Sequence, residues 1–432
     1  MRFLSLVFAL AAALSAAELT PAEKIKQGHS RHGESFDEGP RSRPWEMTGI
    51  GHAHLAITHE NPEVQKWFDQ GITLLHSFWD FEAERAFRWC LKLEPGNAMA
   101  WWGLARATSG DRQKEFARQA ARRKNTVSER ERLYIEALEQ SVVRDPLRDR
   151  GDDYKAANED YRKVLETIAV KYPEEIEARA LLALAGIGEA RYATEQIIRE
   201  VLAKQPDHPG AHHYRIHNWN YHEPEMALDS CRRYGEVAPD TGHALHMPGH
   251  VYATVGMWNE AAISMDSATR AEKRYMRERL TFPFNAWNYG HNRNYLNYIL
   301  EQLGMAEAAI FGARQMLDAP LDPKYNSNAG YSTHSQGMAS LVRTLVKFER
   351  WNDLLAPDAF PWRDTFLDKM TRYYAEARAH FGLGDLEKAE KSMEQLAGLE
   401  KQLDKEKEFE KVYRLRGLPS GPIPANLKRS SS

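Results

Sequence analysis

The chain has 432 residues, of which 42% are hydrophobic and 28% charged, a composition typical of a water-soluble protein with room for two or three compact domains. Its 58 Lys and Arg residues nearly balance its 61 Asp and Glu residues, and the resulting net charge of −3 argues against a nucleic-acid partner. The chain has two cysteines, Cys90 and Cys231, which excludes a disulfide-stapled scaffold and a cysteine-rich zinc or iron–sulfur domain.

The first segment, residues 1–17, has the features of a secretory signal peptide. Arg2 is followed by an apolar run over 3–14, and the small residues 15–17 form a cleavage site before Glu18. The apolar run is too short to cross a bilayer whose hydrocarbon core is about 30 Å thick. We therefore expect a periplasmic or secreted protein without a membrane span. The alternative is an uncleaved N-terminal anchor.

Residues 18–60 are polar and interrupted by Gly and Pro, which predicts an extended leader. Helical periodicity begins at Asn61, and an internal repeat follows. The spacing of six residues in the first copy matches the tetratricopeptide repeat (TPR) pattern: Trp67, Gly71, Leu74, Ala83, Phe87 and Pro95. Similar copies recur over 249–268, 303–308 and 381–389, with a weaker one over 348–354. The repeat predicts an all-α fold, a TPR-like α-solenoid of antiparallel helix pairs over 61–400, then a charged capping helix and disordered tail over 401–432.

Histidines are concentrated in one part of this repeat region. Eight of the 17 lie within residues 208–250. His213 and His217 are four residues apart, as are His246 and His250, so each pair projects from one face of a helix. The two pairs are separated by 33 residues, one repeat length, and should occupy equivalent positions on successive first helices. His291 begins the first helix of the next repeat.

This spacing predicts a metal site with His213, His217, His246 and His250 as ligands and His291 as a fifth ligand or a close neighbour. Tyr252 and Asn292 are candidates for groups that support the ligands. Imidazole ligands suit copper or zinc, and also iron. The lack of a thiolate argues against a closed structural zinc site, and an open coordination position would allow a metal-bound water to react.

The segments 213–217 (H-Y-R-I-H), 243–252 (H-A-L-H-M-P-G-H-V-Y) and 291–292 (H-N) resemble motifs of bacterial exported TPR proteins, H-Y-x-I-H and H-M-P-x-H-[IV]-Y. The resemblance covers most of the chain after the signal and is most specific over 208–295. It implies that the histidines line the concave groove of the repeat, without implying an activity. An acidic residue tends to follow the first histidine pair in these relatives, whereas 218–220 reads N-W-N here.

Three functions remain open at the level of sequence. The groove could hold a metal and bind a small molecule or peptide, or it could be a metal-free scaffold for a protein or peptide partner. The third is a metalloenzyme, such as a copper-dependent oxidase or a hydrolase. The zincin motif HExxH, the serine-hydrolase elbow G-x-S-x-G, the P-loop and the Rossmann glycine pattern do not occur in the sequence.

Overall fold

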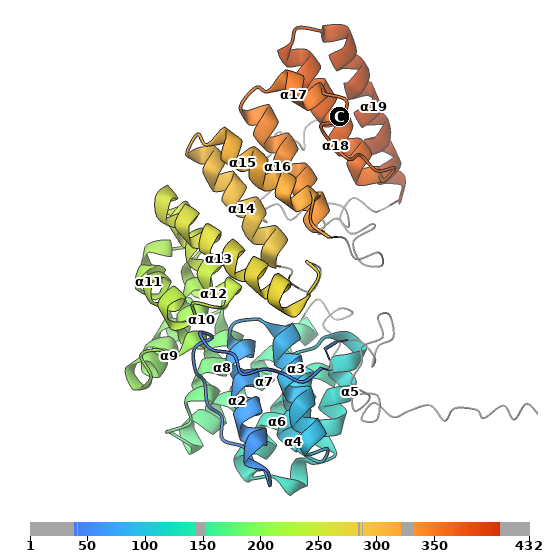
Figure 1. Ribbon diagram of the computed structural model, residues 1–432. Coiled ribbons are helices and arrows are strands. Elements are labelled where there is room, and N and C mark those ends of the chain that lie inside the picture. Colours follow the sequence, from blue (N-terminus) through green and yellow to red (C-terminus); the bar gives the residue numbers. More distant parts are fainter. Residues whose placement is uncertain are drawn as a thin grey trace, which may run out of the picture. The chain divides into compact units, whose positions relative to one another are not determined.

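The computed structural model describes residues 39–40, 42–143, 152–283, 286, 288–320 and 332–406. All regular secondary structure within these ranges is helical, and consecutive helices pack in neighbouring pairs (Figure 1). The predicted all-α fold of helix pairs is therefore confirmed. The chain divides into two compact units.

The first unit comprises 1–46, 54–75 and 79–175. Its helices are α2 (Pro62–His76, whose last residue belongs to the second unit), α3 (Asp80–Leu93), α4 (Ala98–Arg106), α5 (Gly110–Ala121), the short η1 (Lys124–Thr126), α6 (Glu129–Val143) and α7 (Asp152–Lys171). Gly71 of α2 and Gly103 of α4 both face the ring of Phe87, and a Cβ on either would lie 2.6 or 2.5 Å from it. The small residues of the repeat therefore allow the helices to pack closely around this ring.

The second unit comprises 47–53, 76–78 and 176–432. Its helices are α8 (Ile176–Gly186), α9 (Arg191–Lys204), α10 (Pro209–Trp219), η2 (Pro224–Ala227), α11 (Leu228–Val237), α12 (Gly242–Thr254), α13 (Trp258–Arg279), α14 (Asn288–Gln302), α15 (Ala306–Leu317), α16 (Thr333–Lys347), α17 (Trp351–Leu355), α18 (Phe366–Gly382) and α19 (Leu386–Glu406). The core around α10–α14 is built from large buried side chains such as Trp219, Tyr234 and Met265.

The turns inside the helix pairs explain the repeated glycines. Gly256, Gly304 and Gly384 have φ values of 81°, 75° and 82°, in the left-handed region that glycine adopts without steric cost. Glu349 stands at the same place in the weaker copy and also has a positive φ, of 53°. The weaker copy therefore keeps the turn geometry with a residue less suited to it.

Residues 42–60 of the predicted leader contain no helix or strand, and residues 54–60, which belong to the first unit, are tied to it by hydrogen bonds. The backbone N–H and hydroxyl of Thr58 donate to the carboxylate of Glu131, each at 2.6 Å. The predicted signal peptide of 1–17 and the tail after 406 lie outside the described residues. Among those described, no helix is both long and apolar enough to cross a membrane.

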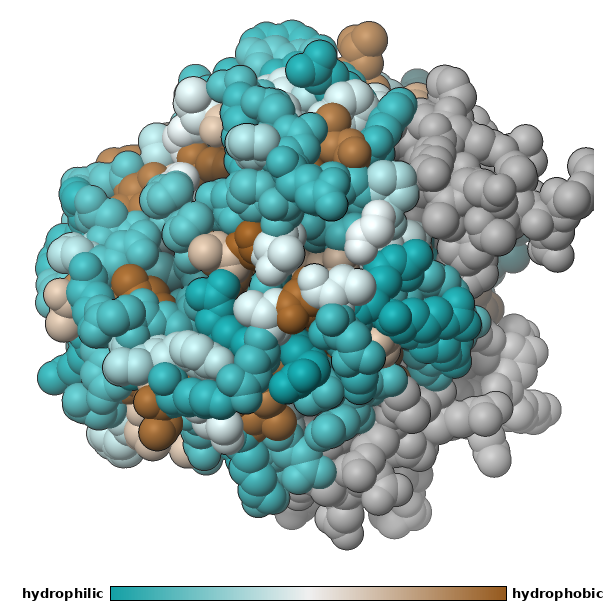
Figure 2. Space-filling model, turned by 90° about the horizontal axis from the view of Figure 1, so that it is seen from below, coloured by the Kyte–Doolittle hydropathy of each residue, from teal (hydrophilic) through white to brown (hydrophobic). Residues whose placement is uncertain are grey.

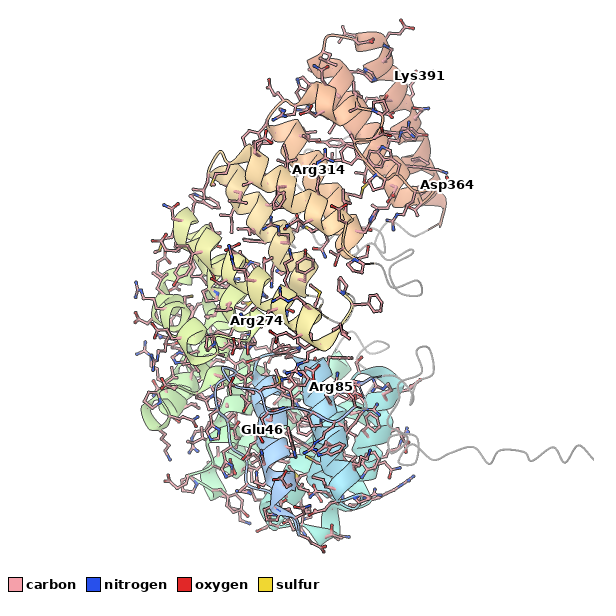
Figure 3. All side chains as sticks on the ribbon, viewed as in Figure 1. Glu46, Arg85, Arg274, Arg314, Asp364 and Lys391 are labelled. Atoms are coloured by element: carbon pink, nitrogen blue, oxygen red, sulfur yellow. The ribbon has the colours of Figure 1, made fainter. Side chains whose placement is uncertain are left out.

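Cys90 on α3 and Cys231 on α11 are both buried, and both thiols are free. The face drawn in Figure 2 is mostly hydrophilic, with hydrophobic residues scattered over it. Arg274 and Asp364, labelled in Figure 3, belong to exposed ion pairs at 2.5 Å, with Asp240 and Lys369. Exposed pairs of this kind contribute little to stability.

Candidate metal centre

Three helices of the second unit carry six histidines that come together in two groups of three. Helix α10 begins at Pro209, after the N-cap residue His208, whose side chain accepts a hydrogen bond from the backbone N–H of Ala211 at 3.0 Å. The six histidines are His213 and His217 on α10, His243, His246 and His250 on α12, and His291 on α14. Spacings of three and four residues place the histidines of each helix along one face.

The first triad is His213, His217 and His243. The Nε2 atom of His213 lies 3.0 Å from Nε2 of His217 and 2.9 Å from Nε2 of His243. Nitrogen ligands about 2.0–2.1 Å from one zinc ion lie roughly 3 Å from each other, so this spacing fits a shared ion. His213 and His243 are buried, whereas His217 is partly exposed.

The second triad is His246, His250 and His291. The Nε2 atoms of His250 and His291 are 3.1 Å apart, and the ring of His246 lies 5.2 and 5.1 Å from those two rings, centre to centre. His246 is buried, and the other two are partly exposed. The ring of Tyr295 packs edge-on against His250 with the centres 4.3 Å apart, which limits the orientation of this ligand.

A backbone carbonyl sets the tautomer of His213. The Nδ1 atom lies 2.5 Å from the carbonyl oxygen of His76, which can only accept, so Nδ1–H donates and the neutral ring keeps a lone pair on Nε2. Metal-binding histidines almost always donate their second ring N–H in this way. The lone pair of His213 therefore points toward the other two nitrogens of the first triad.

A second hydrogen-bond chain acts on His243. Its Nδ1 lies 3.5 Å from Oδ1 of Asn288, and the Asn288 amide is hydrogen-bonded to the buried carboxyl of Glu272. With the amide N–H group donating to Glu272, Oδ1 is free to accept from Nδ1–H of His243. The neutral His243 ring then also presents a lone pair on Nε2, 2.9 Å from that of His213. In the other tautomer of His243, Nε2–H donates to Nε2 of His213, so the contact is then a hydrogen bond. The tautomer with a lone pair on both Nε2 atoms is the one that can hold a cation between them.

Burial keeps the histidines of both triads neutral. It lowers the pKa of His217 and His291 to about 4 and that of His243 to about 3. Burial, reinforced by the neighbouring imidazoles, also holds the pKa of the other three well below its usual range: His213, His246 and His250. At neutral pH all six rings can therefore bind a metal without first losing a proton.

Aromatic side chains pack against the first triad. The centre of the Phe78 ring lies 4.4 Å from the ring centre of His213 and 5.6 Å from the ring centres of His217 and His243. Tyr234 stacks on His213 at 5.4 Å. Phe78 has a φ of 52°, an uncommon conformation for a bulky residue, so its position over the triad is held at a conformational cost.

Two observations indicate that the residues fit a metal. Both triads consist of imidazoles alone, the donor type that suits copper and zinc. Within the described residues, the buried Nδ1 atom of His246 has no hydrogen-bond partner. Buried polar atoms are normally satisfied, so a ligand outside the protein chain would account for this atom.

A third group, His76, Glu177 and His208, is also completely buried but is better described as a hydrogen-bonded cluster. Nδ1 of His208 already accepts from Ala211, so Nε2 carries the proton and faces the Glu177 carboxylate at 3.3 Å. Burial raises the pKa of Glu177, but the adjacent imidazoles of His76 and His208 outweigh this effect and hold it well below its usual range. The cluster fixes His76, whose carbonyl orients His213.

The structure distributes the residues predicted from sequence over both triads. His213 and His217 lie together with His243, which was not among the predicted ligands, while His246 and His250 lie together with His291. Tyr252 packs in the hydrophobic core around α10–α14. Asn292, next to His291, is fully buried, and within the described residues neither polar atom of its amide has a hydrogen-bond partner.

Sequence reasoning missed His243 and the cluster of His76, Glu177 and His208. His243 was detectable, because it precedes His246 by three residues and so shares its helix face. His76 had no comparable signal, since its partner Glu177 is 101 residues away in the chain.

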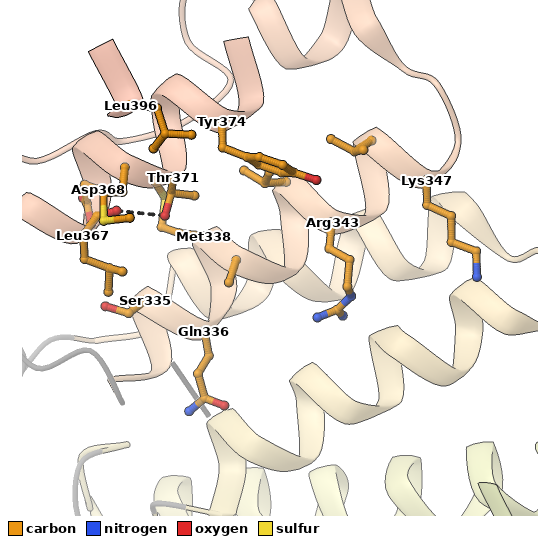
Figure 4. A pocket seen from close by; sticks show the side chains of 14 residues that line it. Ser335, Gln336, Met338, Arg343, Lys347, Leu367, Asp368, Thr371, Tyr374 and Leu396 are labelled. Carbon is orange, nitrogen blue, oxygen red and sulfur yellow. Dashed lines mark hydrogen bonds between the residues drawn. The ribbon is translucent and has the colours of Figure 1, made fainter. Parts of the chain in front are cut away.

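A separate cavity of about 600 Å³ lies between α16 and α18, with Leu396 of α19 completing its wall (Figure 4). Its wall is mainly apolar and includes Met338, Leu367 and Leu396. Figure 4 shows Ser335 and Gln336 at one end of the cavity and Arg343 and Lys347 toward the other, with Asp368, Thr371 and Tyr374 of α18 across from them.

No family model and no curated protein matches the sequence.

Proposed function

We propose that this protein is an exported TPR-like protein that binds copper or zinc through its histidine triads, in a groove formed by the first helices of successive repeats. The observation that carries the proposal is the convergence of imidazole nitrogens 2.9–3.1 Å apart on α10, α12 and α14. The hydrogen bond from His213 to the His76 carbonyl supports it, because it orients a lone pair toward the proposed ion.

Elemental analysis of the purified, untagged protein tests the proposal. We expect copper or zinc in stoichiometric amount, and its loss in a His213→Ala/His246→Ala variant. His59→Ala is the matched control, since His59 is an exposed histidine outside both triads. Far-UV circular dichroism verifies that each variant remains helical. A helical wild-type protein that binds no metal even after reconstitution would refute the proposal.

Export rests on residues 1–17, and the family assignment on the motif resemblance around 208–295. Fractionation of cells that express the full chain tests the first point. We expect the mature protein, shortened by the signal peptide, outside the cytoplasm. A full-length protein retained in the cytoplasm would contradict export while leaving metal binding untouched.

The cavity between α16 and α18 favours a second function, binding of a peptide or small molecule. Its apolar wall suits an apolar side chain, and the ammonium group of Lys347 at one end suits a carboxylate. The neighbouring Arg343 is already paired with Glu301 at 2.9 Å. We therefore propose a ligand with an apolar body and one negative end, such as a peptide C-terminus. Met338→Lys should abolish its binding, as measured by a peptide-library pulldown compared with wild type.

Catalysis is the remaining candidate. Three protein ligands leave a coordination position open, which is typical of catalytic zinc sites and allows a bound water to act as a nucleophile. Redox chemistry, as in a copper-dependent oxidase, is the alternative if the metal is copper. Azide should alter the absorption spectrum of the copper-loaded protein if an exchangeable position exists, and an unchanged spectrum would argue against both activities.

A further inference from the structure

We infer that the two histidine triads hold two metal ions as one dinuclear centre, whose ions share a small bridging anion. The inference rests on the proposed metal binding and deepens it. It depends on three properties of the triads: their proximity, their lack of charged ligands and their access to solvent.

The triads are neighbours because α12 contributes to both. His243 belongs to the first triad and His246 to the second, and three residues along a helix correspond to a rise of about 4.5 Å. The two rings are in edge-to-face contact with their centres 4.5 Å apart. Ions in the two triads would therefore be close enough to share a small ligand.

The donor count favours one ion in each triad over a single ion bound by all six imidazoles. Within each triad the ligand atoms lie within 4.8 Å of one another, and the neighbouring residues His243 and His246 of α12 belong to different triads. The rings of His250 and His291 are stacked 5.2 Å apart in the second triad, and those of His217 and His243 are 6.1 Å apart in the first. Each triad is thus a complete three-nitrogen site.

The charge of the ligands requires an anion. Six neutral imidazoles would leave two divalent ions with four uncompensated positive charges in a largely buried site. Among the described residues, no carboxylate belongs to either triad. Glu272 acts on His243 only through Asn288, and Glu177 is separated from His213 by the His76 residue.

Solvent can reach both sites. His217 on the first triad and His250 and His291 on the second are partly exposed, whereas the rings at the junction, His243 and His246, are buried. A small anion, such as hydroxide or azide, could enter from the open positions and bind both ions.

Copper(II) alone is the probe for the test. The full-length protein is loaded with copper(II), the excess is removed, and copper per chain is compared with the intensity of the electron paramagnetic resonance (EPR) signal. We expect two copper ions per chain and loss of most of the EPR intensity, because a bridging anion couples the two unpaired spins. A colorimetric copper(I) chelator verifies that the silent copper is still oxidised.

Two single variants separate the triads. His217→Gln removes a ligand of the first triad and His291→Gln a ligand of the second, so each should bind one copper ion with full EPR intensity. His59→Ala should behave like the wild type. The two variants provide independent tests. If circular dichroism shows that one of them misfolds, the other still tests the inference.

The outcomes distinguish this inference from the proposal on which it rests. Two copper ions with full EPR intensity, or one copper ion in the wild type, would overturn the dinuclear centre and leave metal binding in place. Loss of all copper in both single variants, with helicity intact, would also overturn it. Absence of copper from the correctly folded wild type would overturn metal binding as well.

Discussion

Acidification of the metal-free protein should destabilise the second unit steeply between pH 6.5 and 4. In the folded state, burial lowers the pKa of His217 and His291 to about 4 and that of His243 to about 3. In the unfolded chain each histidine returns to a pKa of about 6.5. The unfolded state therefore binds more protons, and stability that is present above pH 6.5 is lost as the pH falls through this window.

The size of the effect follows from these pKa values. At pH 5 an unfolded histidine is almost fully protonated, while the folded one is almost neutral. Since pH 5 lies about 1.5 units below the unfolded pKa, each histidine lowers the free energy of unfolding by about 2 kcal/mol. The three histidines together would lower the free energy of unfolding by about 6 kcal/mol. The whole free energy of unfolding of many domains is only roughly 5–15 kcal/mol. The other three members of the triads act in the same direction.

Urea unfolding in EDTA, followed by tryptophan fluorescence at several values of pH, measures this loss. The slope of unfolding free energy against pH should fall by about 1.4 kcal/mol per pH unit in His291→Gln, which removes one titrating group. An unfolding free energy that changes by less than about 1 kcal/mol between pH 7.5 and 5 would refute the reasoning. It would mean that the histidines are hydrated and free to ionise in the folded protein.

Three further predictions concern single residues. Asn288→Ala removes the acceptor for Nδ1–H of His243, so metal affinity measured by competition with a chelator should fall about 10–100-fold; unchanged affinity would exclude this orienting role. Gly71→Ala places a Cβ 2.6 Å from the Phe87 ring and should destabilise the first unit by about 1–3 kcal/mol in thermal unfolding, and an unaltered melting temperature would contradict the close packing. Burial raises the pKa of Glu272 to about 7, so its contribution to stability is lost as the pH rises from about 4.5 to 7. Glu272→Gln cannot ionise, so it should not show this loss. Relative to wild type, its free energy of unfolding in urea, measured on the metal-free protein, should be higher at pH 8 than at pH 5 by up to about 3 kcal/mol. The absence of such a gain would show that the carboxyl is already solvated.

The fold was largely readable from the sequence because its turns depend on local chemistry. Glycines such as Gly256 and Gly304 recur after a helix and before the next, and the structure places both in left-handed turns. Likewise, the spacing of four residues in the pairs 213/217 and 246/250 is a property of any α-helix. Such features require no knowledge of distant contacts.

The partition of the histidines could not be derived in the same way. The repeat length made His213 equivalent to His246, yet the structure pairs His213 with His243, three residues earlier on α12. Tertiary packing sets the register in which α10 faces α12. That register moves the partner of His213 by almost one helical turn, although the repeat length of the sequence is unchanged. The link between His76 and Glu177 is likewise a long-range contact.

The purely nitrogenous composition of the triads has a consequence for selectivity among the cations of an aqueous environment. Mg²⁺ and Ca²⁺ are hard ions that bind oxygen ligands and give up their water reluctantly to other donors. Both triads offer imidazoles only, so these ions find no suitable ligand even where they far outnumber copper or zinc. The centre would thus discriminate by the softness of its donors rather than by electrostatic attraction, and high concentrations of calcium or magnesium should leave it available to scarce transition metals.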